Sequence, residues 1–360
     1  MRKIFLYAYD KQNLGDDLFI HTITKRYPSA KFYIISDEKN IRNFAGITNL
    51  EVINKNSFLI RILNRIRPSF AVRYLNFWEA RCDATVYIGG SIFMEYPTWR
   101  DMCKWWEYEA EHRNFYILGA NFGPWHTREY KERMASIYLK MKDVSFRDQY
   151  SKDLFSDIFT VRYAPDILFS YPVPKVKIKE KQIFVSIINC ANRDENYSLL
   201  EYDKRYVTNM ACLLNEYLNN GYNLILSAFC KTEGDEEGVF KVLSAMGKES
   251  DSRIQILTYD GTNYSKIITA IAESGLVIAT RFHAMILALV AGRPVMPLIY
   301  SNKVKNVLKE FESEDRFVDI RDNKEWTPEK VLKICLPQDI SRQAENHFSK
   351  LDLMFKKGVS

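Results

Sequence analysis

The sequence predicts an α/β protein made of two Rossmann-like domains that face each other across a cleft. The chain has 360 residues, and a single hydrophobic core stops growing at roughly 250–300 residues, so two domains are expected. Short apolar runs alternate with longer segments of helical period, which is typical of parallel strands joined by crossover helices. A lysine-rich stretch with two prolines, residues 171–181, separates two such series and is interpreted as a linker.

The first series predicts strands at residues 3–9, 31–35, 84–88, 114–118 and 143–146, with a helix over 17–27. The second predicts strands at residues 182–188, 223–227, 253–257, 276–279 and 294–298, with helices over 203–218 and 263–273. We therefore expect domains over residues 1–172, on the acceptor side, and 181–327, on the donor side. A polar helical segment, 328–360, is expected to pack back on the first domain.

Composition excludes several classes of protein. The 51 basic and 45 acidic residues leave a net charge of +6, too small for a nucleic-acid footprint but compatible with anionic small molecules or an anionic membrane surface. Six cysteines without a CxxC pair argue against a zinc site and a disulfide scaffold, so no metal is predicted. The N-terminus is interpreted as a strand, and no apolar run is long enough to span a membrane. A cytoplasmic protein, soluble or peripheral at the inner face of the membrane, is expected.

Three loops that follow predicted strands are rich in Gly, Asn and Asp. Because the carboxyl ends of parallel strands share one edge of a sheet, these loops are expected to line a ligand site. Each also has a purely structural interpretation: Asp16 or Asp17 can cap the helix that follows, and paired glycines make tight turns. The candidate cleft or acceptor residues here are Asn13, Gly15, Asp16, Asp17, Gly89, Gly90, Ser91 and Asn121.

Arg147 ends a strand of buried character, where its charge needs a partner or a ligand. A salt bridge to Asp148 or to Asp166 is the structural alternative. Asp166 is expected either to position Arg147 or to face the acceptor. Asp235 lies in an acidic loop whose carboxylates bind sugar hydroxyls in one interpretation and are merely solvated in the other.

The strongest local pattern is Arg281-Phe282-His283 between a strand and an apolar helix. Arginine offers a planar, permanently charged fork for carboxylate or phosphate, and histidine can transfer a proton near neutral pH. At a helix N-terminus, which itself favours anions, the two predict a site for a small phosphorylated acid.

Residues 58–70 combine apolar side chains with arginines at 61, 65 and 67. Such a segment is either a basic amphipathic helix that lies on an anionic membrane or a crossover helix with snorkelling arginines.

The ordered motifs resemble the polysaccharide pyruvyl transferase family over about residues 3 to 310. They are Asn13-Leu14-Gly15-Asp16-Asp17, Gly89-Gly90-Ser91, Gly119-Ala120-Asn121-Phe122-Gly123-Pro124, Phe146-Arg147-Asp148, Ala164-Pro165-Asp166 and Arg281-Phe282-His283-Ala284. The resemblance implies two domains of the glycosyltransferase-B type with phosphoenolpyruvate bound between them. It implies donor binding by Arg147, Arg281, Phe282, His283 and Lys303. Phe282 replaces the leucine that is common in the family.

The implied reaction moves the pyruvyl group of phosphoenolpyruvate onto two sugar hydroxyls as a cyclic ketal, in capsule or exopolysaccharide biosynthesis. His283 is the candidate general acid and Arg281 the second catalytic residue. Phosphoenolpyruvate is a substrate, and no cofactor is predicted. The acceptor is a sugar that is lipid-linked on a polyprenyl carrier, nucleotide-linked or polymeric. The alternative function is a glycosyltransferase of the same architecture that uses a nucleotide-sugar, because a fold does not fix chemistry.

Overall fold

The computed structural model describes residues 1–192, 198–313, 315–323, 326, 331, 333–334 and 336–356, with the backbone alone for 68–73. Contacts divide the chain into two compact units. The first unit contains Met1–Asp10, Asp16–Ile167 and Ser341–Ser360. The second unit contains Lys11–Gly15 and Leu168–Ile340. The C-terminal residues thus group with the first unit, and a short loop after the first strand groups with the second.

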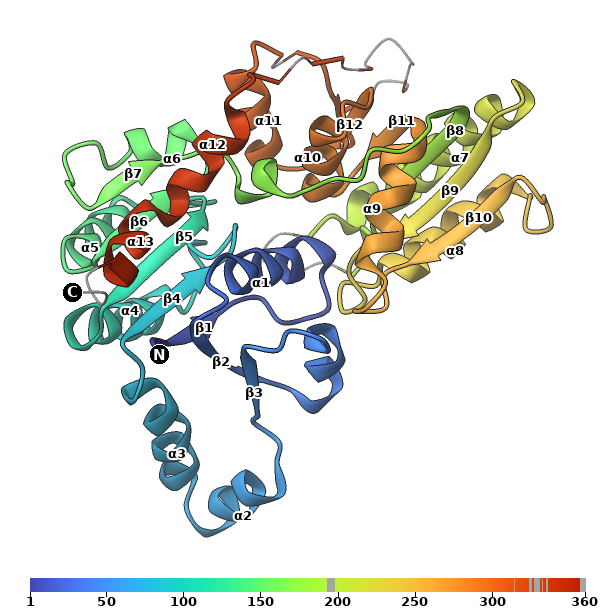
Figure 1. The fold of residues 1–360 in the computed structure, drawn as a ribbon. Coiled ribbons are helices and arrows are strands. Elements are labelled where there is room, and N and C mark those ends of the chain that lie inside the picture. Colours follow the sequence, from blue (N-terminus) through green and yellow to red (C-terminus); the bar gives the residue numbers. More distant parts are fainter. Residues whose placement is uncertain are drawn as a thin grey trace. The chain divides into compact units, whose positions relative to one another are not determined.

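The first unit is built on a seven-stranded parallel sheet in the order β3-β2-β1-β4-β5-β6-β7 (Figure 1). Its strands are β1 (Lys3–Tyr7), β2 (Lys31–Ser36), β3 (Leu50–Asn54), β4 (Ala84–Ile88), β5 (Phe115–Ala120), β6 (Asp143–Phe146) and β7 (Val161–Tyr163). The strand order reverses between β1 and β4, and ligands of open α/β sheets bind outside the carboxyl ends of the strands at such a point.

The second unit repeats this plan with a six-stranded parallel sheet in the order β10-β9-β8-β11-β12-β13. The strands are β8 (Lys179–Ile187), β9 (Asn223–Ala228), β10 (Ile254–Thr258), β11 (Ser274–Ala279), β12 (Val295–Ile299) and β13 (Val318–Asp319). Here the order reverses between β8 and β11. The predicted fold class, two Rossmann-like domains, is confirmed.

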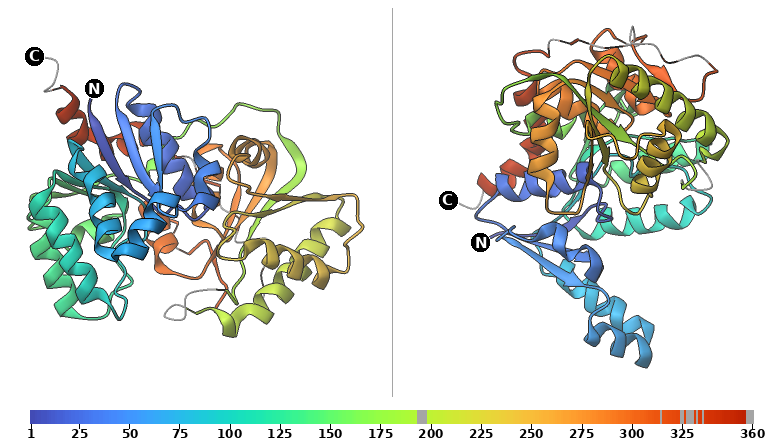
Figure 2. Two further views of the ribbon diagram at one scale, coloured as in Figure 1. Left: turned by 90° about the horizontal axis from the view of Figure 1, so that it is seen from below. Right: turned by 90° about the vertical axis from the view of Figure 1, so that its right-hand side faces the viewer.

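Crossover helices connect the parallel strands. They include α1 (Leu14–Arg26), α2 (Phe58–Ile66), α3 (Pro68–Ala80), α4 (Trp99–His112), α5 (Arg128–Tyr138), α6 (Gln149–Asp153), α7 (Asp203–Asn219), α8 (Asp235–Met246), α9 (Tyr264–Glu273), α10 (Phe282–Val290) and α11 (Asn302–Glu310). The C-terminal helices are α12 (Ile340–Glu345) and α13 (Ser349–Lys356). Figures 1 and 2 show α2 and α3 as a hairpin that projects from the first sheet.

The most deeply buried elements carry the candidate residues at their ends. All six residues of β5 are buried, as expected for a strand covered on both faces. Helix α10 is apolar at eight of its nine positions, and of these only Val290 is not buried. A helix that is apolar all round belongs in a core, so the position of its first turn is tightly fixed.

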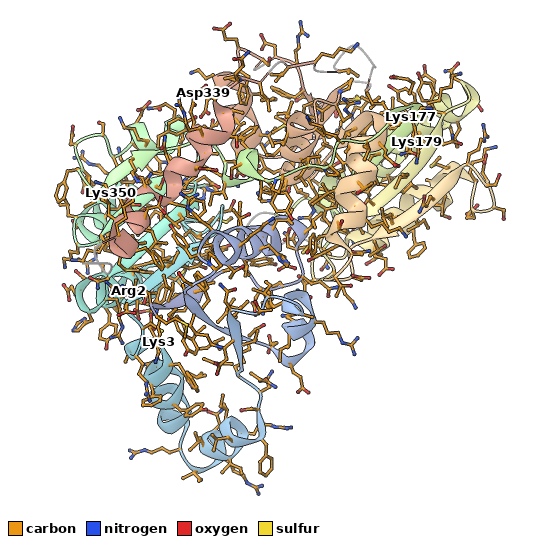
Figure 3. The ribbon with its side chains drawn as sticks, in the orientation of Figure 1. Arg2, Lys3, Lys177, Lys179, Asp339 and Lys350 are labelled. Carbon is orange, nitrogen blue, oxygen red and sulfur yellow. The ribbon has the colours of Figure 1, made fainter. Side chains whose placement is uncertain are left out.

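The structure corrects several predicted boundaries. Strands β3, β7 and β13 were not predicted, and α1 begins at Leu14. Residues 179–181 of the predicted linker belong to β8, whose first residue, Lys179, is labelled in Figure 3 with Lys177 of the preceding segment. Among the described residues of the predicted segment 328–360, the first in a helix is Ile340. Residues 328–330, 332, 335 and 357–360 of that segment lie outside the described part of the chain.

Candidate functional site

In the first unit, the loops after β4, β5 and β6 meet around Arg147. Its guanidinium donates to the Asp166 carboxylate over 3.1 Å and to Oδ1 of Asn121 over 2.7 Å. The Ser91 hydroxyl donates to the same Asn121 oxygen over 3.2 Å. Arg147 is 2% exposed and Asp166 is fully buried. A charge in such surroundings requires a charged and hydrogen-bonded partner, and Asp166 is that partner.

Gly90 lies directly against the Arg147 guanidinium. A Cβ atom at residue 90 would lie 2.5 Å from Nη1 and 2.6 Å from Cζ of Arg147, so any side chain there would displace the guanidinium. The Gly90 carbonyl also accepts from the Asn121 amide over 2.8 Å. Gly89 has no comparable contact, since its nearest neighbour would be the Cγ2 atom of Ile92 at 3.3 Å. Of the two predicted glycines, Gly90 is the one that the arrangement requires.

A buried histidine that was not predicted supports the same loops. Nε2 of His347 lies 2.9 Å from the Pro165 carbonyl, and Nδ1 lies 2.7 Å from the Ser145 hydroxyl. Because a carbonyl only accepts, Nε2 carries the proton and Nδ1 accepts from Ser145. Burial, together with the nearby charge of Arg162, lowers the pKa of His347 to about 3. A neutral His347 therefore holds the turn that precedes Asp166.

In the second unit, Arg281 is the N-cap residue of α10. Its Nε donates to Asp235 over 2.7 Å, its Nη2 donates to the other oxygen of Asp235, and its Nη1 donates to Glu233 over 2.7 Å. The side chain is held bidentately, the geometry that arginine favours with a carboxylate. These three contacts leave further N–H donors on the guanidinium.

Asp235 is fully buried, which changes the role we assign to it. Besides Arg281, its carboxylate accepts from the amides of Phe229 and Cys230 over 3.2 and 2.9 Å. Although burial alone would lower the pKa of Arg281, the charges of Asp235 and Glu233 hold it well above its ordinary value. In this structure Asp235 is buried and not solvated, and it positions Arg281 and the loop after β9.

Ser186, at the end of β8, fixes the backbone of the same turn and was not predicted. Its hydroxyl accepts from the amides of Thr280 and Arg281, both over 3.1 Å. Ser186 is fully buried, so β8 and the start of α10 are joined at the point where the strand order of the second sheet reverses.

His283 lies against the loop 11–15. A Cβ atom at Gly15 would lie 1.6 Å from Nδ1 of His283, so only glycine permits this approach. The loop pairs with the end of β9, where the Leu14 amide donates to the Phe229 carbonyl over 3.1 Å. Asn13 forms a bridge with Cys230. Three predicted residues, Asn13, Gly15 and His283, are therefore gathered in the second unit.

Asn13, and neither aspartate, caps α1. Its Oδ1 accepts from the Gly15 amide over 3.2 Å, as an N-cap side chain does. Asp16 and Asp17 lie inside the first turn of the helix, where negative charge is favourable. Asp17 is fully buried. The expectation that Asp16 or Asp17 caps the helix is wrong because the helix begins earlier than predicted.

Lys303 lies near the same turn. Its Nζ is 6.0 Å from the centroid of the Phe282 ring and 5.7 Å from that of Tyr300. These are cation–π distances. Phe282 is 4% exposed and therefore packs in the core. Its ring contacts the Lys303 ammonium group through the cation–π interaction.

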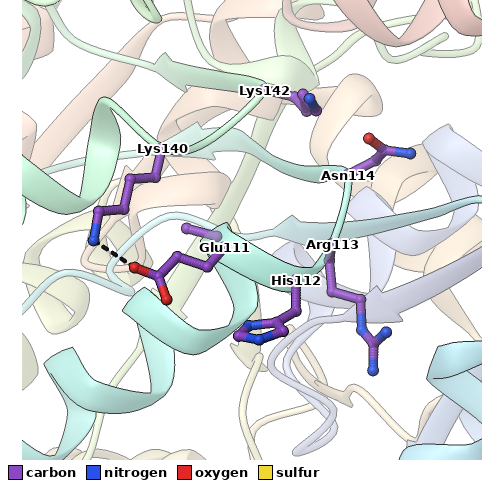
Figure 4. Close-up of a pocket in the computed structure, with 7 residues that line it drawn as sticks. Glu111, His112, Arg113, Asn114, Lys140 and Lys142 are labelled. Carbon is purple, nitrogen blue, oxygen red and sulfur yellow. Dashed lines mark hydrogen bonds and ion pairs between the residues drawn. The ribbon is translucent and has the colours of Figure 1, made fainter.

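A separate hollow lies at the opposite edge of the first sheet (Figure 4). It encloses about 510 Å³ and is lined by Ala110, Glu111, His112, Arg113, Asn114, Lys140 and Lys142. Lys140 pairs with Glu111 across it over 2.6 Å. Asn114 and Lys142 precede β5 and β6, whereas Asn121 and Arg147 follow these strands. The hollow is therefore not part of the candidate site.

Among the residues that the structure describes, no group of three or more His, Cys, Asp or Glu is placed to hold a metal ion. In the same part of the chain, no helix is both long and apolar enough to cross a bilayer.

Comparisons with known proteins show which family the chain resembles in sequence and which structures it resembles in fold. A family model described as polysaccharide pyruvyl transferase matches residues 13–302. The match contains Arg147, Arg281 and His283 and ends one residue before Lys303. No curated protein matches the chain by sequence.

Several solved structures have a similar fold. A putative UDP-N-acetylglucosamine 2-epimerase from Listeria monocytogenes is 12% identical with a TM-score of 0.59, over 99% of this chain and 97% of that one. The UDP-GlcNAc 2-epimerase from Neisseria meningitidis, bound to UDP-GlcNAc, is 10% identical with a TM-score of 0.56, over 99% and 100%. Anabaena HepE, in complex with UDP and glucose, is 13% identical with a TM-score of 0.51, over 99% and 96%. At such identities the likeness shows the fold alone.

Proposed function

Because the chain belongs to the polysaccharide pyruvyl transferase family, we propose that it transfers the pyruvyl group of phosphoenolpyruvate to two hydroxyls of a sugar as a cyclic ketal. The product belongs to capsule or exopolysaccharide biosynthesis, on the cytoplasmic side of the membrane. The acceptor sugar is carried on a polyprenyl-linked intermediate.

The observation that carries this proposal is the turn between β11 and α10. It presents a rigidly held arginine and a half-buried histidine at the N-terminus of the buried helix α10, and Lys303, from the first turn of α11, lies 6.0 Å from the centroid of the Phe282 ring. Phosphoenolpyruvate carries up to about three negative charges in a small volume, and helix N-termini with arginine and lysine are suited to such anions. We assign the anionic groups of the donor to Arg281 and Lys303 in this unit.

His283 is assigned as the general acid. It protonates the methylene carbon of phosphoenolpyruvate, whose π electrons form the new C–H bond and leave an oxocarbenium-like centre at the neighbouring carbon. One sugar hydroxyl adds to this centre, phosphate departs with the electrons of its C–O bond, and the second hydroxyl closes the ring. Of the two protons lost by the hydroxyls, one restores His283 and the other leaves with phosphate. General acid catalysis of this kind contributes about 10²–10⁴-fold.

Arg147 is retained as a second donor contact, on the resemblance of its motif. Its pairing with Asp166 and Asn121 gives it a fixed orientation, and a preorganised charge stabilises a departing phosphate without reorganisation. Ser91, which is exposed at the end of β4, is the most accessible of the proposed acceptor residues.

Pyruvyl transfer is tested in D₂O with 3-¹³C-labelled phosphoenolpyruvate and a panel of p-nitrophenyl hexosides as acceptors. Protonation at the methylene carbon predicts a singly deuterated methyl group on a ketal carbon, observed by ¹³C NMR, with one phosphate released for each ketal. A product that keeps its methylene group would contradict the reaction.

The role of His283 is tested with His283→Ala. We expect transfer to fall by about 10²–10⁴-fold because the proton donor is lost, while phosphoenolpyruvate still binds in calorimetry because Arg281 and Lys303 remain. Phosphate release at the wild-type rate would refute the assignment of His283.

A further inference from the structure

The hairpin of α2 and α3 exposes an unusual amount of apolar surface. On α2, Phe58 is 73% exposed, Leu59 48%, Ile62 38% and Ile66 67%. Phe77, on α3, is 47% exposed. A crossover helix of a soluble domain normally turns its apolar side chains toward the sheet. Figures 1 and 2 show instead that this hairpin extends away from the first sheet, with α2 at its outer end.

The helical periodicity of α2 separates an inner and an outer face. Phe58, Ile62 and Ile66 follow one another at intervals of four residues and therefore lie on one side of the helix. Ile60 points away from that side and is 2% exposed. The helix is thus attached to the unit through Ile60, while its larger apolar face is presented outward.

Positive charge borders this outer face. Arg61 and Arg65 precede Ile62 and Ile66 by one residue, Arg67 follows the helix, and all three are exposed. Between residues 52 and 78 the sequence has five basic residues and no aspartate or glutamate. Among the described residues, none forms an ion pair with these three arginines.

We propose that the outer face of α2 docks on an anionic membrane surface. An apolar face bordered by arginines matches the boundary between acyl chains and anionic headgroups, with the arginine stems extending toward the phosphates. A protein partner of matching shape would need acidic groups, whereas an anionic lipid supplies both the charge and the apolar layer. The attachment is reversible, because nine residues of amphipathic helix and three arginines provide far less than an inserted span.

Sedimentation with vesicles tests this without any enzymatic activity, so its failure is separate from a failure of the proposed function. We use vesicles of phosphatidylcholine alone and vesicles that contain phosphatidylglycerol in addition. The wild-type chain should sediment with the anionic vesicles only, and binding should weaken in 1 M salt, where the Debye length falls to about 3 Å. Binding to both compositions alike would overturn the proposal.

Two variants and a matched control identify the surface. Arg61→Glu with Arg65→Glu and Arg67→Glu should lower partitioning by at least about 100-fold, since each basic residue near an anionic leaflet contributes about 1 kcal/mol. Phe58→Ser with Ile62→Ser and Ile66→Ser should lower it with the charge unchanged. The control, Lys39→Glu with Lys204→Glu and Lys248→Glu, replaces three exposed lysines elsewhere and lowers the net charge from +6 to 0, as the arginine variant does.

The control should retain most of the binding. Equal loss in the control would show that net charge alone causes the sedimentation and would overturn the proposal. A second outcome would also overturn the proposal. If the wild-type chain forms a concentration-dependent dimer, and the serine variant loses the dimer but still binds vesicles, then α2 packs against a second copy of the chain.

Discussion

Gly15 and His283 approach each other so closely that the imidazole ring can keep its position only because residue 15 has no side chain. In Gly15→Ala the new Cβ atom would lie 1.6 Å from Nδ1 of His283, so the imidazole must move. A displacement of about 1 Å can cost about 100-fold in rate. We expect the rate of transfer, measured with saturating phosphoenolpyruvate, to fall by about that factor while the chain stays folded.

A matched control for this variant is Gly292→Ala, just beyond the other end of α10. A Cβ atom at Gly292 meets nothing within 4 Å, although its φ of +65° makes any side chain strained. We expect a loss of about 1 kcal/mol in stability and no loss of rate. An unchanged rate in Gly15→Ala would place the chemistry away from His283.

The Asp235 carboxylate has three hydrogen-bonding partners. It binds the Arg281 guanidinium and accepts from the backbone amides of Phe229 and Cys230. Asp235→Asn removes the charge from this buried arrangement, which leaves Arg281 with Glu233 alone. Breaking one partner of a buried ion pair costs about 3–5 kcal/mol. We expect a loss of that order in the free energy of unfolding in urea.

The comparison for Asp235→Asn is Glu132→Gln, which breaks the pair with Arg128 on the surface of α5. These side chains are 60% and 89% exposed, and an exposed pair of this spacing is worth about 0.5 kcal/mol or less. Similar losses in the two variants would mean that the Arg281 pair is not a buried structural unit.

At the scale of single residues, the sequence identifies candidate site residues more successfully than it identifies the partners they contact. Arg147, Asn121 and Gly90 were predicted from their positions after successive strands and Asp166 as a partner of Arg147, and the four do meet. The pairing of Asp235 with Arg281 spans 46 residues, and no local pattern indicates that a carboxylate in an acidic loop will be fully buried.

The C-terminal segment is the element whose contribution depends most clearly on pH. In the folded chain His347 has a pKa of about 3, whereas an unfolded histidine titrates near about 6.5. Between these values the unfolded state binds the proton and the folded state does not. Stability should therefore fall as the pH drops from about 6.5 toward 3, by up to about 1.4 kcal/mol per pH unit.

His347→Gln isolates this contribution. Glutamine cannot take up the proton, so the slope of unfolding free energy against pH should be shallower than in the wild type by up to about 1.4 kcal/mol per unit. Burial also lowers the pKa of His21, but that contribution is present in both proteins and cancels. Parallel slopes in the two proteins would show that His347 is not buried in its neutral form.

Whether an element could be predicted depends on its length and position. Buried strands such as β5 and β12 give continuous apolar runs and were predicted to within two residues at each end. The strands that were missed lie toward the edges of the sheets: β3 is only partly buried, and β7 and β13 have three and two residues. Such strands bury too few side chains to leave a recognisable period.

For the whole molecule, the parallel strand orders of both units describe the fold, and structures named as UDP-N-acetylglucosamine 2-epimerases have a similar fold. The choice between donors therefore rests on the site, because one architecture supports many chemistries. Two findings favour phosphoenolpyruvate: the family match over residues 13–302, and the position of Arg281 and His283 at the N-terminus of α10, with Lys303 near the Phe282 ring between them.

The most direct test is a calorimetric titration of the full chain with phosphoenolpyruvate, UDP-glucose and UDP-N-acetylglucosamine under identical conditions. The proposed function predicts saturable binding of phosphoenolpyruvate with a Kd in the range of about 1 μM to 1 mM, typical of enzyme substrates, and no binding of either nucleotide-sugar. Arg281→Lys should weaken this binding, because lysine cannot reproduce the fork of arginine. Saturable binding of a nucleotide-sugar, with no heat from phosphoenolpyruvate, would contradict the assignment.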